Sequence, residues 1–270
     1  MTIVVKVGGR VLKSNFERLL DSLAAAWKSG TRLVFVHGGG DQVTEFCQKL
    51  GIQPRFLVSP SGIRSRYTSW EELEVYLMVM AGLVNKRLVA GLLARGVKSV
   101  GLSGLDGALV IAERKKKLIA VDERGRKMLV EGGYTGKITS ADASLIERLL
   151  ELGHVPVIAP IAYGDGVPLN VDGDQMAARL AEALRTEALV LLTDVPGVFV
   201  NGSLVERLSP SEASLLAERV GPGMNRKLAL AAEAVSRGVG RAVIASGLTE
   251  DPIGEALRGG GTVIVGTERL

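Results

Sequence analysis

Two short apolar runs near the N-terminus each stop at a cluster of glycines. The first covers residues 4–7 and precedes Gly8 and Gly9, and the second covers 34–37 and precedes glycines 38–40. A β-strand that ends in this way gathers bare backbone N–H groups, which bind phosphate or carboxylate oxygens, above all where a helix begins just beyond. Lys6 lies inside the first run, and because a lysine is costly to bury, we expect it to emerge at the strand end and face an anion. The two runs therefore predict a site for phosphoryl groups without a Walker loop.

Strand-like and helix-like segments alternate along most of the chain. This alternation predicts an α/β protein in which helices cover both faces of a largely parallel central sheet. Strands are expected at 2–7, 32–37, 155–159, 188–192, 241–245 and 262–265, and helices at 15–29, 41–50, 70–95, 141–152, 174–185 and 224–237.

The expected helix at 70–95 is the longest. Its middle, 76–84, is apolar all round, so more than one of its sides must be buried. A central core helix is the favoured interpretation, and a subunit interface is the alternative.

Residues 107–130 have a different pattern, which predicts antiparallel hairpins in the N-terminal lobe. Short alternating runs at 108–112, 117–121 and 128–130 are separated by charged turns. The glycine-rich segment that follows is expected to be mobile. A soft boundary falls near residue 185, but no linker rich in proline, glycine or serine marks it. We therefore expect the lobes 1–185 and 186–270 to share one continuous sheet.

Composition argues against several classes of protein. Cys47 is the only cysteine, so an internal disulfide and a cysteine-based zinc cluster are excluded, and a reducing, cytoplasmic location is expected. Aromatic residues make up 4% of the chain, which disfavours the stacking of nucleic-acid bases. No uninterrupted apolar run approaches the roughly 18 residues that a membrane span requires, and no secretory signal is visible. We expect no membrane or nucleic-acid partner.

The net charge of +4 is concentrated in residues 111–137, which we call the basic lobe. This segment holds eight basic and four acidic residues, and the rest of the chain is balanced. A local excess of positive charge on a neutral protein suggests an acidic partner or substrate. A solvated hairpin face is an equally good interpretation.

Several polar residues stand where chemistry is possible. Lys227 follows a glycine-rich entry into a helix, where a positive charge is unfavourable unless an anion is shared. Alone, it would be read as a solvated lysine. Asp174 begins a helix, where aspartate is a common N-cap, yet with Asn170 it could instead reach a shared site. A turn-forming role explains Asp194 at least as well as contact with a nucleotide does.

No side chain in this set is an evident general base. A carboxylate nucleophile would need none, because it is already ionised at neutral pH. Lysines, backbone N–H groups and Mg²⁺ would then neutralise and align the transferring group, which are the parts that ATP-dependent phosphorylation of a carboxylate requires.

The motifs, in this order and spacing, resemble the amino acid kinase family over nearly the whole chain, and acetylglutamate kinases most closely. They are Lys6-Val-Gly-Gly, His37-Gly-Gly-Gly, Asn170-x-x-x-Asp174, Thr193-Asp-Val-Pro-Gly197 and Gly223-Met-x-x-Lys227. The resemblance implies a three-layer αβα sandwich, ATP and Mg²⁺ as cofactors, no metal site built by the protein, and a homodimer. It also implies that 1–185 binds the amino acid and 186–270 the nucleotide.

The resemblance also implies a role for each matching residue. Lys6 and Lys227 would stabilise the transferring phosphoryl group, and Asp174 would hold both lysines. The remaining matches divide into the substrate-binding residues Gly9, Gly39, Gly40, Arg64 and Asn170 and the nucleotide-binding residues Thr193, Asp194, Gly197 and Val198.

The chain departs from ordinary acetylglutamate kinases at 62–68, 101–107, 133–137 and 170–175. In these segments it looks like the branch that acts on α-aminoadipate or glutamate attached to the small acidic carrier protein LysW, in lysine and sometimes arginine biosynthesis. An acidic carrier would also give the basic lobe a partner, presenting its amino acid past Tyr134 and Lys137 to Arg64. The alternative is a kinase of free N-acetylglutamate. A non-enzymatic sensor is disfavoured because both lysines are present.

Overall fold

The central feature of the structure, a computed structural model that describes residues 1–60, 62, 64–121 and 125–266, is a sheet of eight strands. Neighbouring strands from β5 to β17 run parallel, whereas β18 pairs antiparallel with β17. In spatial order the strands are β16 (Arg207–Leu208), β18 (Thr262–Val265), β17 (Arg241–Ser246), β13 (Ala188–Thr193), β1 (Thr2–Val7), β2 (Arg32–His37), β10 (Val155–Ala159) and β5 (Ser99–Ser103). Strands from both sides of residue 185 thus share one sheet, as predicted.

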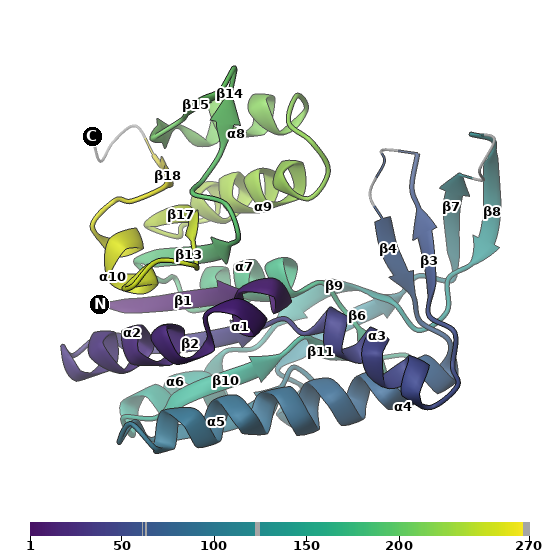
Figure 1. Cartoon of the computed structure of the whole chain (residues 1–270), viewed down its shortest axis with the longest axis horizontal. Coiled ribbons are helices and arrows are strands. Elements are labelled where there is room, and N and C mark those ends of the chain that lie inside the picture. The colour runs from purple at the N-terminus through teal and green to yellow at the C-terminus, as the bar shows by residue number, and fades with distance from the viewer. Residues whose placement is uncertain (61, 63, 122–124, 267–270) are drawn as a thin grey trace.

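Alternate residues of the strands face two different hydrophobic layers. In β1, Ile3, Val5 and Val7 pack on one side, and Val4 packs on the other. The first layer is built with α1 (Gly9–Ser14), α2 (Phe16–Lys28), α3 (Gly40–Lys49), α4 (Trp70–Leu77), α5 (Asn85–Leu93) and α10 (Pro252–Leu257). The second is built with α6 (Ser144–Glu151), α7 (Gly173–Ala183), α8 (Pro210–Ala217) and α9 (Met224–Ser236). This is the predicted three-layer αβα sandwich (Figure 1).

The long helix is continuous from α4 to α5 through a π-helical stretch, Met78–Val84. The whole helix, Trp70–Leu93, has 24 residues and is long and apolar enough to cross a membrane. Within the protein, 44% of its most apolar 18-residue segment is buried. Val79, Met80 and Val84 belong to the core, as the favoured interpretation predicts, but Met78 is 57% exposed.

Further strands lie outside the eight-stranded sheet and form smaller sheets and hairpins. The prediction of antiparallel hairpins in 107–130 is confirmed by β7 (Lys117–Val121), which pairs with β8 (Lys127–Glu131). The first run, β6 (Val110–Arg114), instead pairs antiparallel with β9 (Gly136–Ala141), a strand that was not predicted. The hairpins β7/β8 and β3/β4 (Arg55–Val58, Arg64–Tyr67) project side by side from the body (Figure 1). A second sheet of four strands has the order β12 (Val167–Asn170), β11 (Ile161–Gly164), β6 and β9, in which β11 pairs antiparallel with β12 and parallel with β6. A separate small pair is formed by β14 (Phe199–Val200) and β15 (Ser203–Leu204).

The glycine-rich segment expected to be mobile is instead packed. Gly132 and Gly133 are buried, and a Cβ at Gly133 would lie 2.3 Å from the carbonyl oxygen of Thr68. Tyr134 donates its N–H to the same carbonyl oxygen at 2.7 Å. The glycines at these positions allow close backbone contact rather than motion. In the basic lobe, residues 122–124 lie outside the described residues.

Candidate active site

The glycines after β1 and β2 lie against one another at the carboxyl end of the sheet. A Cβ at Gly38 would lie 2.9 Å from the backbone nitrogen of Gly9, and one at Gly9 would lie 3.2 Å from the nitrogen of Gly39. Gly39 has φ = 153°, which also favours glycine. Helix α1 begins at Gly9 and α3 begins at Gly40, so two helix N-termini meet here. The two glycine clusters thus lie together at two helix starts, as an anion cradle would require, and anion binding there stays a prediction.

Asp174 lies between the two lysines that the sequence singled out. Its Oδ1 is 2.7 Å from Nζ of Lys6, and its Oδ2 is 2.5 Å from Nζ of Lys227. All three side chains are at least 86% buried. The N-cap of α7 is Asp172, which accepts a hydrogen bond from the N–H of Gln175 at 2.8 Å, so Asp174 is free of that task.

Two cations share one carboxylate in this trio, which leaves a surplus of positive charge. Burial raises the pKa of Asp174, but Lys6 and Lys227 outweigh burial and hold that pKa well below its usual value. Burial and the positive charge of Lys6 lower the pKa of Lys227, whereas Asp174 raises the pKa of Lys6 against the effect of burial. An anion bound at the trio would relieve the repulsion between the lysines.

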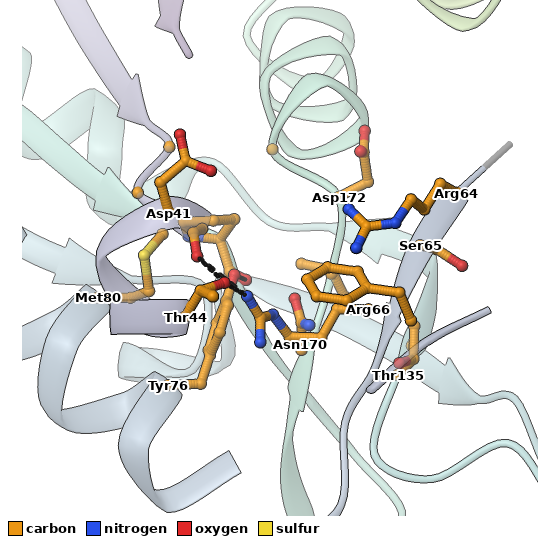
Figure 2. A pocket seen from close by; sticks show the side chains of 18 of the residues that line it. Asp41, Thr44, Arg64, Ser65, Arg66, Tyr76, Met80, Thr135, Asn170 and Asp172 are labelled. Carbon is orange, nitrogen blue, oxygen red and sulfur yellow. Dashed lines mark hydrogen bonds between the residues drawn. The ribbon is translucent and has the colours of Figure 1, made fainter. Parts of the chain in front are cut away.

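Two cavities meet at Lys6. The larger cavity has a volume of about 540 Å³ and is lined by five residues predicted for the site, namely Lys6, Gly39, Gly40, Arg64 and Asn170 (Figure 2). The smaller cavity has a volume of about 250 Å³ and is lined by Lys6, Gly9, Gly40, Thr193, Asp194 and Lys227.

Two of the predicted nucleotide-binding residues line neither cavity. Val198 is fully buried in the core, and its N–H donates to Oγ1 of Thr262 at 2.9 Å. A Cβ at Gly197 would lie 2.8 Å from both Oγ1 of Thr262 and a methyl of Leu204. In this structure both residues pack against protein. Asp194, by contrast, is at the smaller cavity and is 2.5 Å from Nη1 of Arg10.

The arginines of β4 lie differently from one another. The guanidinium of Arg64 stacks on the ring of Phe56, 3.6 Å from its centroid, and is exposed to the larger cavity. The side chain of Arg66 is 8% exposed and donates to Glu72 at 3.1 Å, to the carbonyl oxygen of Gly40 at 3.0 Å and to the hydroxyl of Thr44 (Figure 2). Through its hydrogen bonds to Gly40 and Thr44, Arg66 connects the hairpin β3/β4 to the start of α3.

Sequence reasoning missed the polar network behind the glycines. His37 is fully buried, and its Nδ1 lies 3.0 Å from the carbonyl oxygen of Gly38. Nδ2 of Asn85 lies 3.2 Å from Nε2 of His37 and 2.8 Å from the carbonyl oxygen of Val157. The amide therefore donates to Nε2, which leaves the proton on Nδ1. Asn85 follows the apolar run 76–84 directly, and a polar side chain in a helix expected to be buried could have indicated this network.

Two further cations line the larger cavity. Lys115 belongs to the basic lobe, and Arg226 stands next to Lys227 at the start of α9. Lys116 and Lys117 are exposed, whereas Lys115 is half-buried.

The described part of the chain holds no group of three or more histidine, cysteine, aspartate or glutamate residues that could bind a metal. Asp41 and Asp194 are the carboxylates that line the smaller cavity. A divalent cation there would need oxygen ligands from a bound substrate and from water in addition.

Known proteins share both the sequence and the fold. Residues 1–246 match the model of the amino acid kinase family. LysW-aminoadipate/LysW-glutamate kinases from Sulfolobus acidocaldarius and Sulfurisphaera tokodaii are each 52% identical to the chain, covering 97% of it and 99% and 100% of their own lengths. The structure of N-acetylglutamate synthase from Neisseria gonorrhoeae with coenzyme A and N-acetyl-glutamate has a TM-score of 0.81 and 27% identity, covering 98% of this chain and 59% of that one.

Proposed function

Because the chain belongs to the amino acid kinase family, we propose that it transfers the γ-phosphoryl group of ATP to the side-chain carboxylate of α-aminoadipate or glutamate carried by LysW. The products are an acyl phosphate and ADP, in lysine biosynthesis and, for glutamate, in arginine biosynthesis. Relatives that are 52% identical over nearly their whole length carry this name.

One observation carries the proposal: the two cavities meet at the buried trio of Lys6, Asp174 and Lys227. A carboxylate in the larger cavity and a terminal phosphate in the smaller cavity would face each other across Lys6. Both groups are anions, so the main barrier is electrostatic, and two lysines with the glycine N–H groups are suited to lower it. The attacking carboxylate is already ionised, and the nearby imidazole of His37 is engaged with protein on both nitrogens.

The smaller cavity fits the phosphates of a nucleotide. A Cβ at Gly8 or Gly40 would meet no atom within 4 Å, so the backbone there is open to a ligand. Mg²⁺, when bound with the nucleotide, would supply further charge neutralisation, held by phosphate oxygens, water and Asp41 or Asp194. Thr193 and Asp194 line this cavity on the side of 186–270, the part to which we assign the nucleotide, with 1–185 binding the acceptor.

We assign docking of the acidic carrier to the basic lobe. The hairpin β7/β8 begins at Lys117, close in sequence to Lys115, which lines the larger cavity, and it projects from the body of the protein (Figure 1). Lys116, Lys117 and Lys127 are exposed and available to an acidic surface. A carrier held there would place its amino acid close to Arg64.

The proposal includes a cytoplasmic homodimer with no membrane or nucleic-acid partner. Met78 and Leu93 of the long helix are 57% and 53% exposed, and these two apolar side chains are candidate contacts between protomers. Light scattering on the purified protein tests the dimer.

Phosphorylation of free N-acetylglutamate is the second candidate. The observation that favours it is the likeness to the Neisseria gonorrhoeae N-acetylglutamate synthase, whose structure holds N-acetyl-glutamate.

The experiment that separates the two candidates measures ATP consumption with carrier-linked aminoadipate, carrier-linked glutamate and free N-acetylglutamate. We expect turnover only with a carrier-linked acceptor, and a KM that rises with salt because surface charges are screened. Equal or better activity on free N-acetylglutamate would contradict the proposal.

A further inference from the structure

The larger cavity contains more positive charge than phosphoryl transfer uses. Lys6 is paired with Asp174, and Arg66 is paired with Glu72. The other cations in the wall are Arg64, Lys115 and Arg226. Of these three, Arg226 forms an ion pair within the described part of the chain, with Asp172, 3.4 Å from its Nη1.

Lys115 differs from its neighbours in the basic lobe. It is half-buried and lines the larger cavity, whereas Lys116 and Lys117 are exposed. Among the described residues, its Nζ makes no recorded hydrogen bond or ion pair. Its backbone is fixed, since its N–H donates to the carbonyl oxygen of Thr135 at 2.9 Å. Burial lowers the pKa of Lys115, and the positive charge of Arg226 lowers it further. The carboxylate of Asp172, which is 3.4 Å from Nη1 of Arg226, raises the pKa of Lys115, so one carboxylate serves two cations here.

Arg226 and Lys227 are consecutive on α9 but serve different cavities. Lys227 lines the smaller cavity and contacts Asp174, and Arg226 lines the larger cavity. Successive side chains on an α-helix point about 100° apart, which lets one helix start supply both sides of the site.

We propose that Lys115 and Arg226 form a carboxylate subsite that binds the acceptor through the carboxylate that is not phosphorylated. This inference rests on the proposed function, because an N-blocked amino acid with a reacting side-chain carboxylate has a second carboxylate on its Cα. With one carboxylate at Lys6 and the other at Lys115 and Arg226, both anionic ends of the acceptor meet positive charge. A neutral or singly charged acceptor would leave the two cations with only the carboxylate of Asp172.

The test compares two small acceptor analogues, N-acetyl-α-aminoadipate and the same compound with an α-carboxamide. Each is measured as a competitive inhibitor of ATP turnover, and by calorimetric titration, with the wild-type protein, Lys115→Met and Arg226→Met. We expect the wild type to favour the acid, and each substitution to weaken binding of the acid by about 10- to 100-fold, as for a hydrogen bond to a charged group. Binding of the carboxamide should change little. Lys28→Met, which removes an exposed lysine on α2, is the matched control.

The outcomes separate the subsite from the proposed function. Equal weakening of acid and carboxamide in Lys115→Met would mean a general structural effect and would overturn the subsite. Failure of both compounds to bind the wild type at their solubility limits would also overturn it. If calorimetry shows discrimination that depends on Lys115 while carrier-linked acceptors are not phosphorylated, the proposed function fails and the subsite stands.

Discussion

At the scale of single residues, the site depends on one carboxylate between two lysines. Lys6, Asp174 and Lys227 were all predicted. A lysine in an apolar strand and a lysine at a helix start each break a local expectation, whereas an aspartate at a helix start is common, so Asp174 was singled out by the resemblance. Their common partner was supplied by resemblance, not by local pattern, since Asp174 and Lys227 lie 53 residues apart. The burial of Arg66 and the inward position of Lys115 depend on tertiary packing, which neighbouring residues do not specify.

Replacement of Lys6 by methionine tests the trio. The variant should lower kcat by about 10²- to 10³-fold, the usual loss when one group that stabilises transition-state charge is removed. Its fold should persist, because Asp174 keeps Lys227 as a partner. Steady-state kinetics with a circular-dichroism control measures both, and unchanged turnover would remove Lys6 from the mechanism.

His37 makes a prediction about pH. Burial lowers its pKa from 6.5 to about 4, so between these values the unfolded chain binds more protons than the folded protein. The free energy of unfolding should therefore fall as the pH drops from about 6.5 towards 4, by at most about 1.4 kcal/mol per pH unit from this residue. Urea titrations of the wild type and His37→Asn across this range measure the difference. Parallel curves for the two proteins would show that His37 is not responsible.

At the scale of elements, β1, β2, β10, β13, β17 and β18 were predicted from their apolar, largely β-branched runs, whereas β5 and β16 of the same sheet were missed. The elements that were missed are short or polar. Helix α1 begins at Gly9, and β4 reads Arg64-Ser-Arg66-Tyr67, with no apolar alternation. Helix α8 had a usable signal, since Ser209 and Glu212 form a capping box around Pro210.

The glycine turns support a comparison of two substitutions. Gly38→Ala should destabilise the fold by about 1–3 kcal/mol, because the new Cβ would lie 2.9 Å from the backbone nitrogen of Gly9. Gly40→Ala should leave stability unchanged or raise it, since nothing lies within 4 Å and a flexible residue is removed from a helix start. Chemical denaturation of both variants gives the two free energies. Equal losses would mean that backbone packing between the turns is unimportant.

At the scale of the whole molecule, one sheet joins 1–185 to 186–270 and the excess charge stands on hairpins beside the site. The continuous sheet was predicted from the lack of a linker, and the assignment of each part to a substrate stays a proposal. The sequence could not predict which basic residues of the basic lobe face the larger cavity and which face solvent. Both kinds occur next to each other, since Lys115 lines the cavity and Lys116 is exposed.

Docking is tested by Lys116→Glu/Lys117→Glu with Lys115 left in place. The double variant should raise KM for the carrier-linked acceptor, with kcat nearly unchanged, because exposed charges mainly steer encounter and orientation. The effect should shrink at high salt. A KM equal to that of the wild type would favour a solvated hairpin face. Inclusion of Lys115 would confuse docking with binding inside the larger cavity.

The position of β1 in the sheet has a consequence for synthesis. It is made before both of its neighbours, it pairs with β2 on one side, and its other edge is filled by β13, with Ile3 opposite Ala188. At translation rates of about 5–20 residues per second, that edge waits roughly 10–40 s for its neighbour. Pairing over such a separation is slow, and an open apolar strand can pair with another chain in the meantime. A nascent chain of this protein is therefore at its most aggregation-prone just before β13 emerges.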